Sequence, residues 1–404
     1  MVKTIKILLG ISLICCMLLG LALTSLNMTE MRPTATNVAP QQMDNGLKVS
    51  GLHAPIIIDG NADFASQASS ESWPGNGMPG TPYVISDYVI ITSPSNPAVY
   101  IYDTTVYFII ENVTVRDSTL GEGFKILNVT NGEFRNNIAI NCSTGFSFLS
   151  SSSNNILSGN TAINNSGTGF SFYNSPNNNL INNTAKNIYG SGANGFYFFY
   201  SPNNNLINNT ARDCDTTGFK LDRSSNNILS NNTAATNGEG FYILGSDNTL
   251  MGNTANANSL RGFKLQSCSL NLLIDNTATN NANGIVLDNA SQNVLIYNTV
   301  INNGEGISLQ SASQNILIYN TATGNAHGLS LMYSNYSTIA SNTLSPNDLG
   351  CIWETGCIGN TFDGNICDEG GIPGFNLAIL IGMIAVISAV FLLRKYQCGR
   401  LNLY

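Results

Sequence analysis

A four-residue unit, glycine followed by an apolar, a variable and a second apolar residue, recurs at a fixed distance along this chain of 404 residues. It returns every 22 residues at Gly218, Gly240, Gly262, Gly284, Gly306 and Gly328, and GCIW continues the series at Gly350. A constant period of this length indicates that each repeat is one structural unit, stacked on the next. Because such a stack grows without a second core, the chain length does not imply two globular domains.

The same unit occurs earlier with wider spacing, at Gly123, Gly145, Gly169 and Gly195. The widest gap, 26 residues, precedes Gly195 and contains the insertion IYGSGAN. We expect this insertion to bulge from a turn, because the alternating residues on either side keep their register.

Each repeat places apolar residues two positions apart, as in Phe196 and Phe198, with a leucine and then an alanine further along. A period of two is that of a β-strand with one face inward, and the three apolar positions divide each repeat into three short strands. The frequent Asn, Gly, Thr and Ser argue against helices. The sequence therefore predicts an all-β fold, a parallel β-helix of about 22 residues per coil.

Two columns of asparagine accompany the apolar positions. Amides stacked one coil apart can each donate to one neighbour and accept from the other, so we expect both columns to form structural ladders. The first column is preceded by Gly132 and followed by Ser337 and Thr355. Its members are Asn155, Asn178, Asn204, Asn227, Asn248, Asn271, Asn293 and Asn315. The second column consists of Asn160, Asn183, Asn209, Asn232, Asn253, Asn276, Asn298, Asn320 and Asn342.

The two ends of the chain carry apolar runs that lie outside the repeats. Lys3 and Lys6 precede the first run, which predicts a secretory signal peptide, with a retained N-terminal anchor as the alternative. The second run has the length of a bilayer-spanning helix and is followed by Arg394 and Lys395, which places the repeats outside the cell. The expected segments are a signal peptide (1–25), a linker (26–52), an N-terminal cap (53–97), the β-helix (98–367), a second linker (368–374), a transmembrane helix (375–393) and a cytoplasmic tail (394–404).

The repeats, of the form GFxL-x-x-S-x-N-N-x-L-x-x-N-T-A-x-N-N, resemble those of NosD-like right-handed parallel β-helix proteins and of related carbohydrate-binding and sugar-hydrolysing domains. The opening PIIIDGNADF and the closing IPGFNLAILIGMIAVISAVFLLRK resemble the cap and the membrane anchor of archaeal surface proteins of this type. The resemblance covers nearly all of the mature chain and implies a right-handed β-helix at the cell surface. It implies no particular activity, because this fold carries lyases, hydrolases, adhesins and accessory proteins alike.

Charge and titratable residues narrow the function. The net charge of −8 argues against nucleic acid, whose phosphates require clustered Lys and Arg. The two histidines, His53 and His327, are far apart, so we expect no copper or zinc site. Asp213 and Asp215 share one turn near Lys220, where they are either Ca²⁺ ligands or a solvated turn.

Catalytic pairs are not evident. Glycoside hydrolysis needs two carboxylates about 5 to 9.5 Å apart, whereas Asp222 and Asp288 are three repeats apart, roughly 14 Å at the strand spacing. Two acid and base pairs stand in neighbouring repeats, Glu239 with Arg261 and Glu305 with His327. Surface ion pairs explain them equally well, so we assign no catalytic residue.

Aromatic residues gather on the outward side of neighbouring repeats. If Phe196 and Phe198 point inward, Tyr197 and Phe199 point outward, followed by Tyr200. Tyr173 and Tyr242 belong to the same face. These five aromatic side chains are our candidate ligand-binding residues, able to stack on sugar rings or to contact a partner protein. Alternatively, the insertion before Gly195 folds over them and buries them.

Three cysteines, Cys351, Cys357 and Cys367, lie in and just after the last repeat, where the register places Cys351 at the inward phenylalanine position and Cys357 at the inward leucine position. Outside the cell they predict a disulfide, with its pairing open. Asn-x-Ser/Thr sequons, from glycosylation or from composition alone, occur at Asn112, Asn128, Asn141, Asn164, Asn182, Asn208, Asn231, Asn289 and Asn335.

The leading hypothesis is therefore a non-enzymatic, single-span, membrane-anchored β-helix that binds glycans or neighbouring cell-surface proteins. A polysaccharide lyase or glycoside hydrolase is the alternative, and a structural spacer without a ligand is the third possibility.

Overall fold

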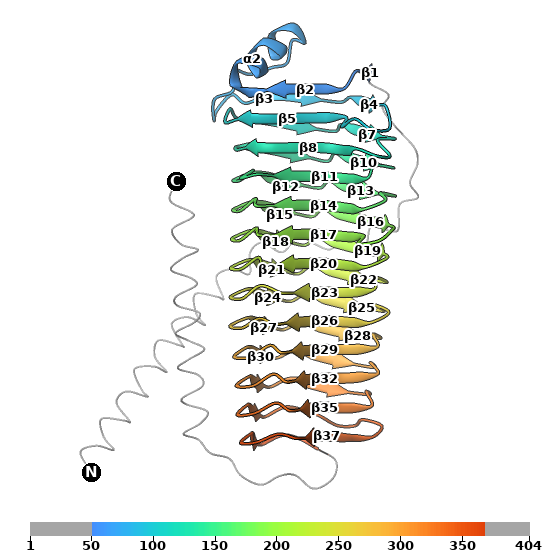
Figure 1. Cartoon of the computed structure of the whole chain (residues 1–404), viewed down its shortest axis with the longest axis vertical. Coiled ribbons are helices and arrows are strands. Elements are labelled where there is room, and N and C mark those ends of the chain that lie inside the picture. Colours follow the sequence, from blue (N-terminus) through green and yellow to red (C-terminus); the bar gives the residue numbers. More distant parts are fainter. Residues whose placement is uncertain (1–50, 368–404) are drawn as a thin grey trace, which may run out of the picture. The chain divides into compact units, whose positions relative to one another are not determined.

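A computed structural model describes residues 51–367, which form one stack of coils built from three parallel β-sheets (Figure 1). A full coil contributes one strand to each sheet, and equivalent residues of successive coils pair in parallel register, as Phe196 does with Phe219. The predicted parallel β-helix with three short strands per coil is confirmed.

Sheet I carries the glycine-led unit at the start of its strands. Its 13 strands, in spatial order, are β2 (Ile56–Asp59), β5 (Val99–Thr104), β8 (Glu122–Val129), β11 (Thr144–Leu149), β14 (Thr168–Tyr173), β17 (Asn194–Phe199), β20 (Thr217–Asp222), β23 (Glu239–Ile243), β26 (Arg261–Gln266), β29 (Asn283–Asp288), β32 (Glu305–Gln310), β35 (His327–Met332) and β37 (Gly350–Thr355).

Sheet II follows sheet I in every coil. Its 13 strands are β3 (Tyr83–Ser86), β6 (Phe108–Glu111), β9 (Gly132–Arg135), β12 (Ile156–Ser158), β15 (Asn179–Ile181), β18 (Asn205–Ile207), β21 (Ile228–Ser230), β24 (Thr249–Met251), β27 (Leu272–Ile274), β30 (Val294–Ile296), β33 (Ile316–Ile318), β36 (Thr338–Ala340) and β38 (Thr361–Asp363).

Sheet III completes the coil. Its 12 strands are β1 (Leu52–His53), β4 (Val89–Ile91), β7 (Thr114–Arg116), β10 (Ile138–Ile140), β13 (Thr161–Ile163), β16 (Thr184–Ile188), β19 (Thr210–Cys214), β22 (Thr233–Ala235), β25 (Thr254–Asn256), β28 (Thr277–Thr279), β31 (Thr299–Ile301) and β34 (Thr321–Thr323).

The N-terminal segment combines a first coil with a helix. Strands β2, β3 and β4 lie within residues 53–97, the segment expected to be the cap, and helix α2 (Gly60–Ser70) is inserted between β2 and β3. Figure 1 places α2 at the end of the stack, beyond β2. The buried Phe64 ring of α2 lies 5.2 Å from that of Phe108, so the helix packs against the apolar core at this end.

The core is a column of stacked phenylalanine rings. From Phe124 to Phe263, the first inward ring of each sheet I strand lies 4.6 to 4.9 Å from the next, with interplanar angles of 2° to 7°. The rings are fully buried, and each contributes about 1.5 to 3 kcal/mol through burial of its apolar surface.

Both predicted asparagine columns form hydrogen-bonded ladders. In the first, the backbone N–H of Asn204 donates to Oδ1 of Asn227 at 2.8 Å, and this contact repeats from coil to coil. One end differs from the prediction: after Ser337 the ladder continues to Asn360, whose Oδ1 accepts from the Ser337 N–H at 2.8 Å, and not to Thr355. The second ladder continues beyond Asn342 to Asn365.

A third ladder, not identified from the sequence, lines the turn between sheet III and sheet I. Its uninterrupted members are Asn237, Asn258, Asn281, Asn303, Asn325 and Asn347. From Asn258 onward, each accepts from the backbone N–H of the preceding member, so buried backbone groups at all three corners of the coil obtain partners.

The last coil departs from the expected register by one residue. Gly350 pairs with His327, a step of 23 residues, and Ile352 pairs with Leu329 at the inward position. The expected placement of Cys351 at the inward phenylalanine position is therefore wrong, because the turn before β37 is one residue longer than in the preceding coils.

The C-terminal cysteines lie where this coil ends. Cys351 and Cys367 form a disulfide with Cα atoms 5.6 Å apart, whereas Cys357 has a free thiol. Cys357 is also not at the inward leucine position, since its Sγ accepts from the Ser334 N–H at 3.3 Å, as serine hydroxyls do in earlier coils.

Within residues 51–367, no helix is both long and apolar enough to cross a bilayer. The expected signal peptide (1–25) and transmembrane helix (375–393) lie outside the described residues, as do the linker (368–374), the tail (394–404) and all but the last two residues of the first linker.

Candidate functional site

The five candidate aromatic residues lie on the outward side of sheet I, and we call them the ring face: Tyr173, Tyr197, Phe199, Tyr200 and Tyr242. Tyr173 is 44% exposed and Tyr200 is 43% exposed, whereas the other three are half-buried. The rings pack on one another, with centroids 5.2 Å apart for Tyr173 and Phe199 and 4.4 Å apart for Phe199 and Tyr200.

The insertion before Gly195 is tied to the neighbouring turns. The Tyr189 N–H donates to the Asn165 carbonyl at 3.0 Å in the preceding coil, and the Gly190 N–H donates to Asp215 Oδ2 at 2.9 Å in the following coil. These bonds hold the insertion at the turn between sheets III and I, and Tyr173 and Tyr200 stay at the surface.

Lysines alternate with the tyrosines in one column of the ring face. Residues Tyr197, Lys220, Tyr242 and Lys264 are paired in successive strands. Nζ of Lys220 lies 5.2 Å from the Tyr197 centroid and 5.7 Å from the Tyr242 centroid, and Nζ of Lys264 lies 4.6 Å from that of Tyr242. The column is therefore a run of cation–π contacts.

A third cation packs on the other half of the ring face. Cζ of Arg223 lies 5.3 Å from the Tyr200 centroid and 5.8 Å from the Phe199 centroid, and the guanidinium donates to the Tyr200 hydroxyl. Burial, together with the nearby Asp222 carboxylate, raises the pKa of Tyr197, so its hydroxyl is neutral at physiological pH. Sequence reasoning missed the three cations, although the repeat register that located the rings also locates both lysines.

Glu239, the first residue of β23, is buried beside this column. Its Oε1 accepts from Nη1 of Arg261 at 2.7 Å, and its side chain is only 10% exposed. The ion pair with Arg261, one of the two alternatives considered for these residues, is present, but the acid lies below the surface. Its Oε2 is buried without a hydrogen-bond donor among residues 51–367. Burial raises the pKa of the carboxyl, an effect that Arg261 opposes.

Asn194 provides a second buried acceptor in the same register. The strands β17, β20 and β23 are neighbours in sheet I, and their first residues, Asn194, Thr217 and Glu239, are paired with one another. Nδ2 of Asn194 donates to the Gly192 carbonyl at 2.7 Å, which fixes the orientation of the amide. Its Oδ1 is buried and, within the described part of the chain, has no donor. Thus, at the beginning of these strands, one buried acceptor lies on each side of Thr217.

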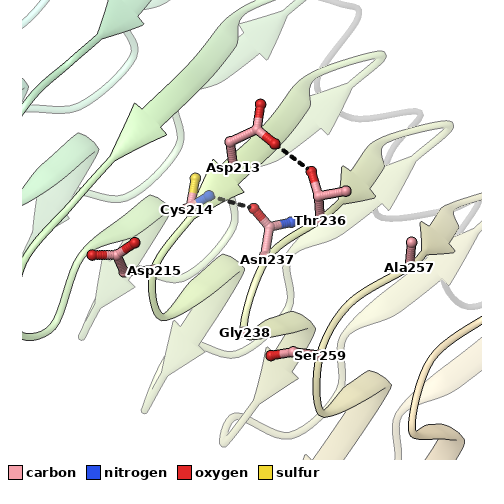
Figure 2. Close-up of a pocket in the computed structure, with 8 residues that line it drawn as sticks. All are labelled: Asp213, Cys214, Asp215, Thr236, Asn237, Gly238, Ala257 and Ser259. Carbon is pink, nitrogen blue, oxygen red and sulfur yellow. Dashed lines mark hydrogen bonds between the residues drawn. The ribbon is translucent and has the colours of Figure 1, made fainter.

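The acidic turn of Asp213 and Asp215 lines a shallow hollow of about 370 Å³. Figure 2 shows the two carboxylates on either side of Cys214. Asp213 Oδ1 accepts from the Thr236 hydroxyl at 2.6 Å, a bond that lowers the pKa of Asp213, and Asp215 Oδ2 accepts from Gly190. No group of three His, Cys, Asp or Glu side chains in residues 51–367 is placed to hold a metal ion.

The remaining candidates are spread along the stack. Asp222 and Asp288 are three coils apart, as expected, because β20 and β29 are separated by β23 and β26. Glu305 contacts His327, with Oε1 and Nδ1 3.1 Å apart, at the starts of β32 and β35, further along sheet I than the ring face. Six sequon asparagines are exposed, and Asn141, Asn164 and Asn335 are half-buried. All but Asn335 have a left-handed backbone, with φ between 49° and 57°.

Comparisons with known proteins agree with this architecture. Residues 185–322 and 255–367 match the family described as periplasmic copper-binding protein (NosD), and residues 80–193 match the right handed beta helix region. A search of curated proteins returned no match.

Solved structures of two epimerases share the fold. The periplasmic alginate epimerase AlgG is 14% identical, over 78% of this chain and 85% of its own, with a TM-score of 0.53. The A-module of the mannuronan C-5 epimerase AlgE6 from Azotobacter vinelandii is 14% identical, over 79% of this chain and 93% of its own, with a TM-score of 0.52. At such identities the likeness concerns the fold alone.

The residues described here do not fit the copper of the matched family description. His53 lies in β1 and His327 in β35, near opposite ends of the stack. The buried thiols of Cys142, Cys214 and Cys268 belong to separate coils, and burial raises the pKa of each to between about 11 and about 12, which disfavours the thiolate that binds metal.

Proposed function

Because this chain is a NosD-like parallel β-helix protein, we propose that it binds polysaccharide outside the cell through the ring face. The observation that carries the proposal is the exposure of Tyr173 and Tyr200 beside three further outward rings. Aromatic faces stack on the apolar faces of sugars, and clusters of exposed rings are uncommon on soluble surfaces. Two proteins of similar fold, AlgG and AlgE6, are named as an alginate epimerase and a mannuronan C-5 epimerase, and these names are consistent with a polysaccharide ligand.

The test is a binding measurement on an array of polysaccharides. We expect the purified protein to bind at least one of them, and Tyr173→Ala with Tyr200→Ala to abolish that binding. Tyr297→Ala with Tyr319→Ala is the matched control, because these tyrosines are also exposed and stacked, 5.2 Å apart, but follow sheet II strands. Equal loss in both double variants would contradict a specific role of the ring face. If the protein binds none of the polysaccharides on the array, a neighbouring surface protein as the partner, or a structural spacer without a ligand, becomes the favoured function.

A polysaccharide lyase or glycoside hydrolase is the second candidate, and Glu239 is the observation that favours it. A buried carboxyl with a raised pKa and a free oxygen is the kind of group that serves as a general acid or base. If the protein cleaves sugar chains, release of reducing ends or of unsaturated products should disappear in Glu239→Gln. Cleavage that survives in this variant would exclude Glu239 as the catalytic group.

We also propose the topology expected from the sequence: a cleaved signal peptide (1–25), an external β-helix and a membrane helix (375–393) before a cytoplasmic tail (394–404). The support is the positive charge beside both apolar runs. Protease added to intact cells should digest the β-helix and spare a tag placed after Tyr404. Digestion of the tag would contradict this orientation. Glycosylation of the sequons is compatible with it, since none of these asparagines is buried.

A further inference from the structure

Lys220, Arg223 and Lys264 differ from most other cations of the described residues. Lys125, Arg135 and Arg261, for example, each have a carboxylate oxygen within 4.0 Å. None of the three ring-face cations has a carboxylate at that distance within residues 51–367, and each packs on aromatic rings instead. A chain with a net charge of −8 thus gathers three cations on one outward face, and in the described part of the chain none of them has an ion-pair partner.

The arrangement of these cations follows the coils. Lys220 and Lys264 belong to the same column and are separated by the coil of Tyr242. Two coils correspond to about 10 Å at the strand spacing. An extended ligand lying parallel to the stack would therefore meet a tyrosine and a lysine in alternation, with an ammonium group at every second coil.

The same strands present acceptors as well as cations. Glu239 Oε2 and Asn194 Oδ1 are buried and have no donor in the described part of the chain. Both atoms are closed to solvent at the starts of their strands, so the accessible part of this face consists of the cations and the rings. A ligand suited to this outward surface carries anionic groups for the lysines and apolar ring faces for the tyrosines.

We propose that the ring face recognises an acidic polysaccharide, a polymer of sugar units that carry carboxylate groups. This inference rests on the proposed polysaccharide binding and narrows its ligand class. The carboxylates contact Lys220 and Lys264, and the sugar faces lie against the tyrosine rings. Asp222 and Asp288, at the ends of sheet I strands, repel the carboxylates of the ligand, so these carboxylates are expected to bind beside the lysines and away from the two aspartates.

The experiment measures binding of the full-length protein in detergent to polygalacturonate and to the same polymer after chemical reduction of its carboxyl groups to alcohols. We expect binding to the acidic form only, weakening as salt is raised. Lys220→Gln with Lys264→Gln should lower the affinity about tenfold, as expected for the loss of two partly exposed charge pairs. Lys186→Gln is the matched control, a half-buried lysine on sheet III that also has no ion pair within 4.0 Å in residues 51–367.

The outcomes separate the two proposals. Equal binding of the acidic and the reduced polymer would overturn the acidic specificity and leave polysaccharide binding intact. Failure to bind any polysaccharide would overturn both. Equal binding of polyglutamate and polygalacturonate would show attraction by charge alone and overturn recognition of an acidic sugar. Unchanged affinity in the double lysine variant would overturn the assignment of the site.

Discussion

Replacing Asn232 by alanine should destabilise the stack at its centre. Asn232 is fully buried, and its Oδ1 accepts from the backbone N–H of Asn209 at 2.8 Å and from Asn209 Nδ2 at 3.0 Å. Its Nδ2 donates to the Leu206 carbonyl at 2.9 Å and to Asn253 Oδ1 at 3.0 Å. One side chain therefore holds four hydrogen bonds that join three coils.

The cost can be worked from the partners that remain after the substitution. Nδ2 of Asn209 keeps its bond to the Leu180 carbonyl, and Oδ1 of Asn253 keeps its bond from the Asn232 N–H. The backbone N–H of Asn209 loses its acceptor and stays buried. One orphaned donor costs roughly 1 to 3 kcal/mol and each weakened bond about 0.5 to 1.5 kcal/mol. We therefore expect a loss of about 3 to 5 kcal/mol.

Hydrogen exchange combined with denaturant titration measures this loss coil by coil. Because each coil contacts only its neighbours, exchange should rise first in β18, β21 and β24. The matched control is Asn231→Gly, the adjacent exposed residue with φ of 55°, where glycine is tolerated. A loss below about 1 kcal/mol in Asn232→Ala, or an equal loss in the control, would refute the ladder as the source of stability.

Phe219→Ala should cost about 3 to 5 kcal/mol, measured by the same titration, because the ring is fully buried between two stacked rings at 4.7 and 4.9 Å. Removing the disulfide by Cys367→Ser should cost about 3 kcal/mol, since it closes a 16-residue separation to Cys351, with faster hydrogen exchange confined to β37 and β38. Burial raises the pKa of Glu239 above its ordinary 4.5, so protonation favours the folded state. The stabilisation is complete below pH 4.5 and is lost as the pH rises through the folded pKa, so the stability of the wild type relative to Glu239→Gln should fall over that window.

The fold was predictable because every coil repeats the same requirement. A parallel stack places equivalent residues in contact, so inward phenylalanines and corner asparagines recur at one period in the sequence. The third ladder was not predicted because its column of asparagines is interrupted in the sequence. Between Asn165 and Asn237 the equivalent positions hold Ile188 and Cys214, beside the insertion that lengthens this turn. The backbone N–H of Cys214 still donates to Asn237, although cysteine cannot continue the ladder.

The candidate site was predictable only in part. The two-residue alternation of a β-strand predicts that the aromatic side chains of the ring face point outward, but it does not predict that Glu239 is buried. That residue begins a strand at a corner of the coil, where burial depends on the turns of neighbouring coils. In the same register Thr217 is 1% exposed, whereas Thr144 and Thr168 are only half-buried. Residue type and repeat position therefore place an acid at the start of a strand, but they do not show whether its side chain is exposed to water.

The sequons illustrate how the fold itself shapes a sequence motif. In Asn231-Asn232-Thr233, the first residue has a left-handed backbone, the second is the ladder asparagine and the third begins β22. Other coils keep the last two residues and place Gly252 or Asp275 at the left-handed position, which asparagine, glycine and aspartate tolerate best. The triplet therefore arises wherever asparagine occupies that turn, without any requirement for a glycan. Asn231→Gly removes the sequon and keeps the ladder, so it separates the effect of a glycan from that of the fold.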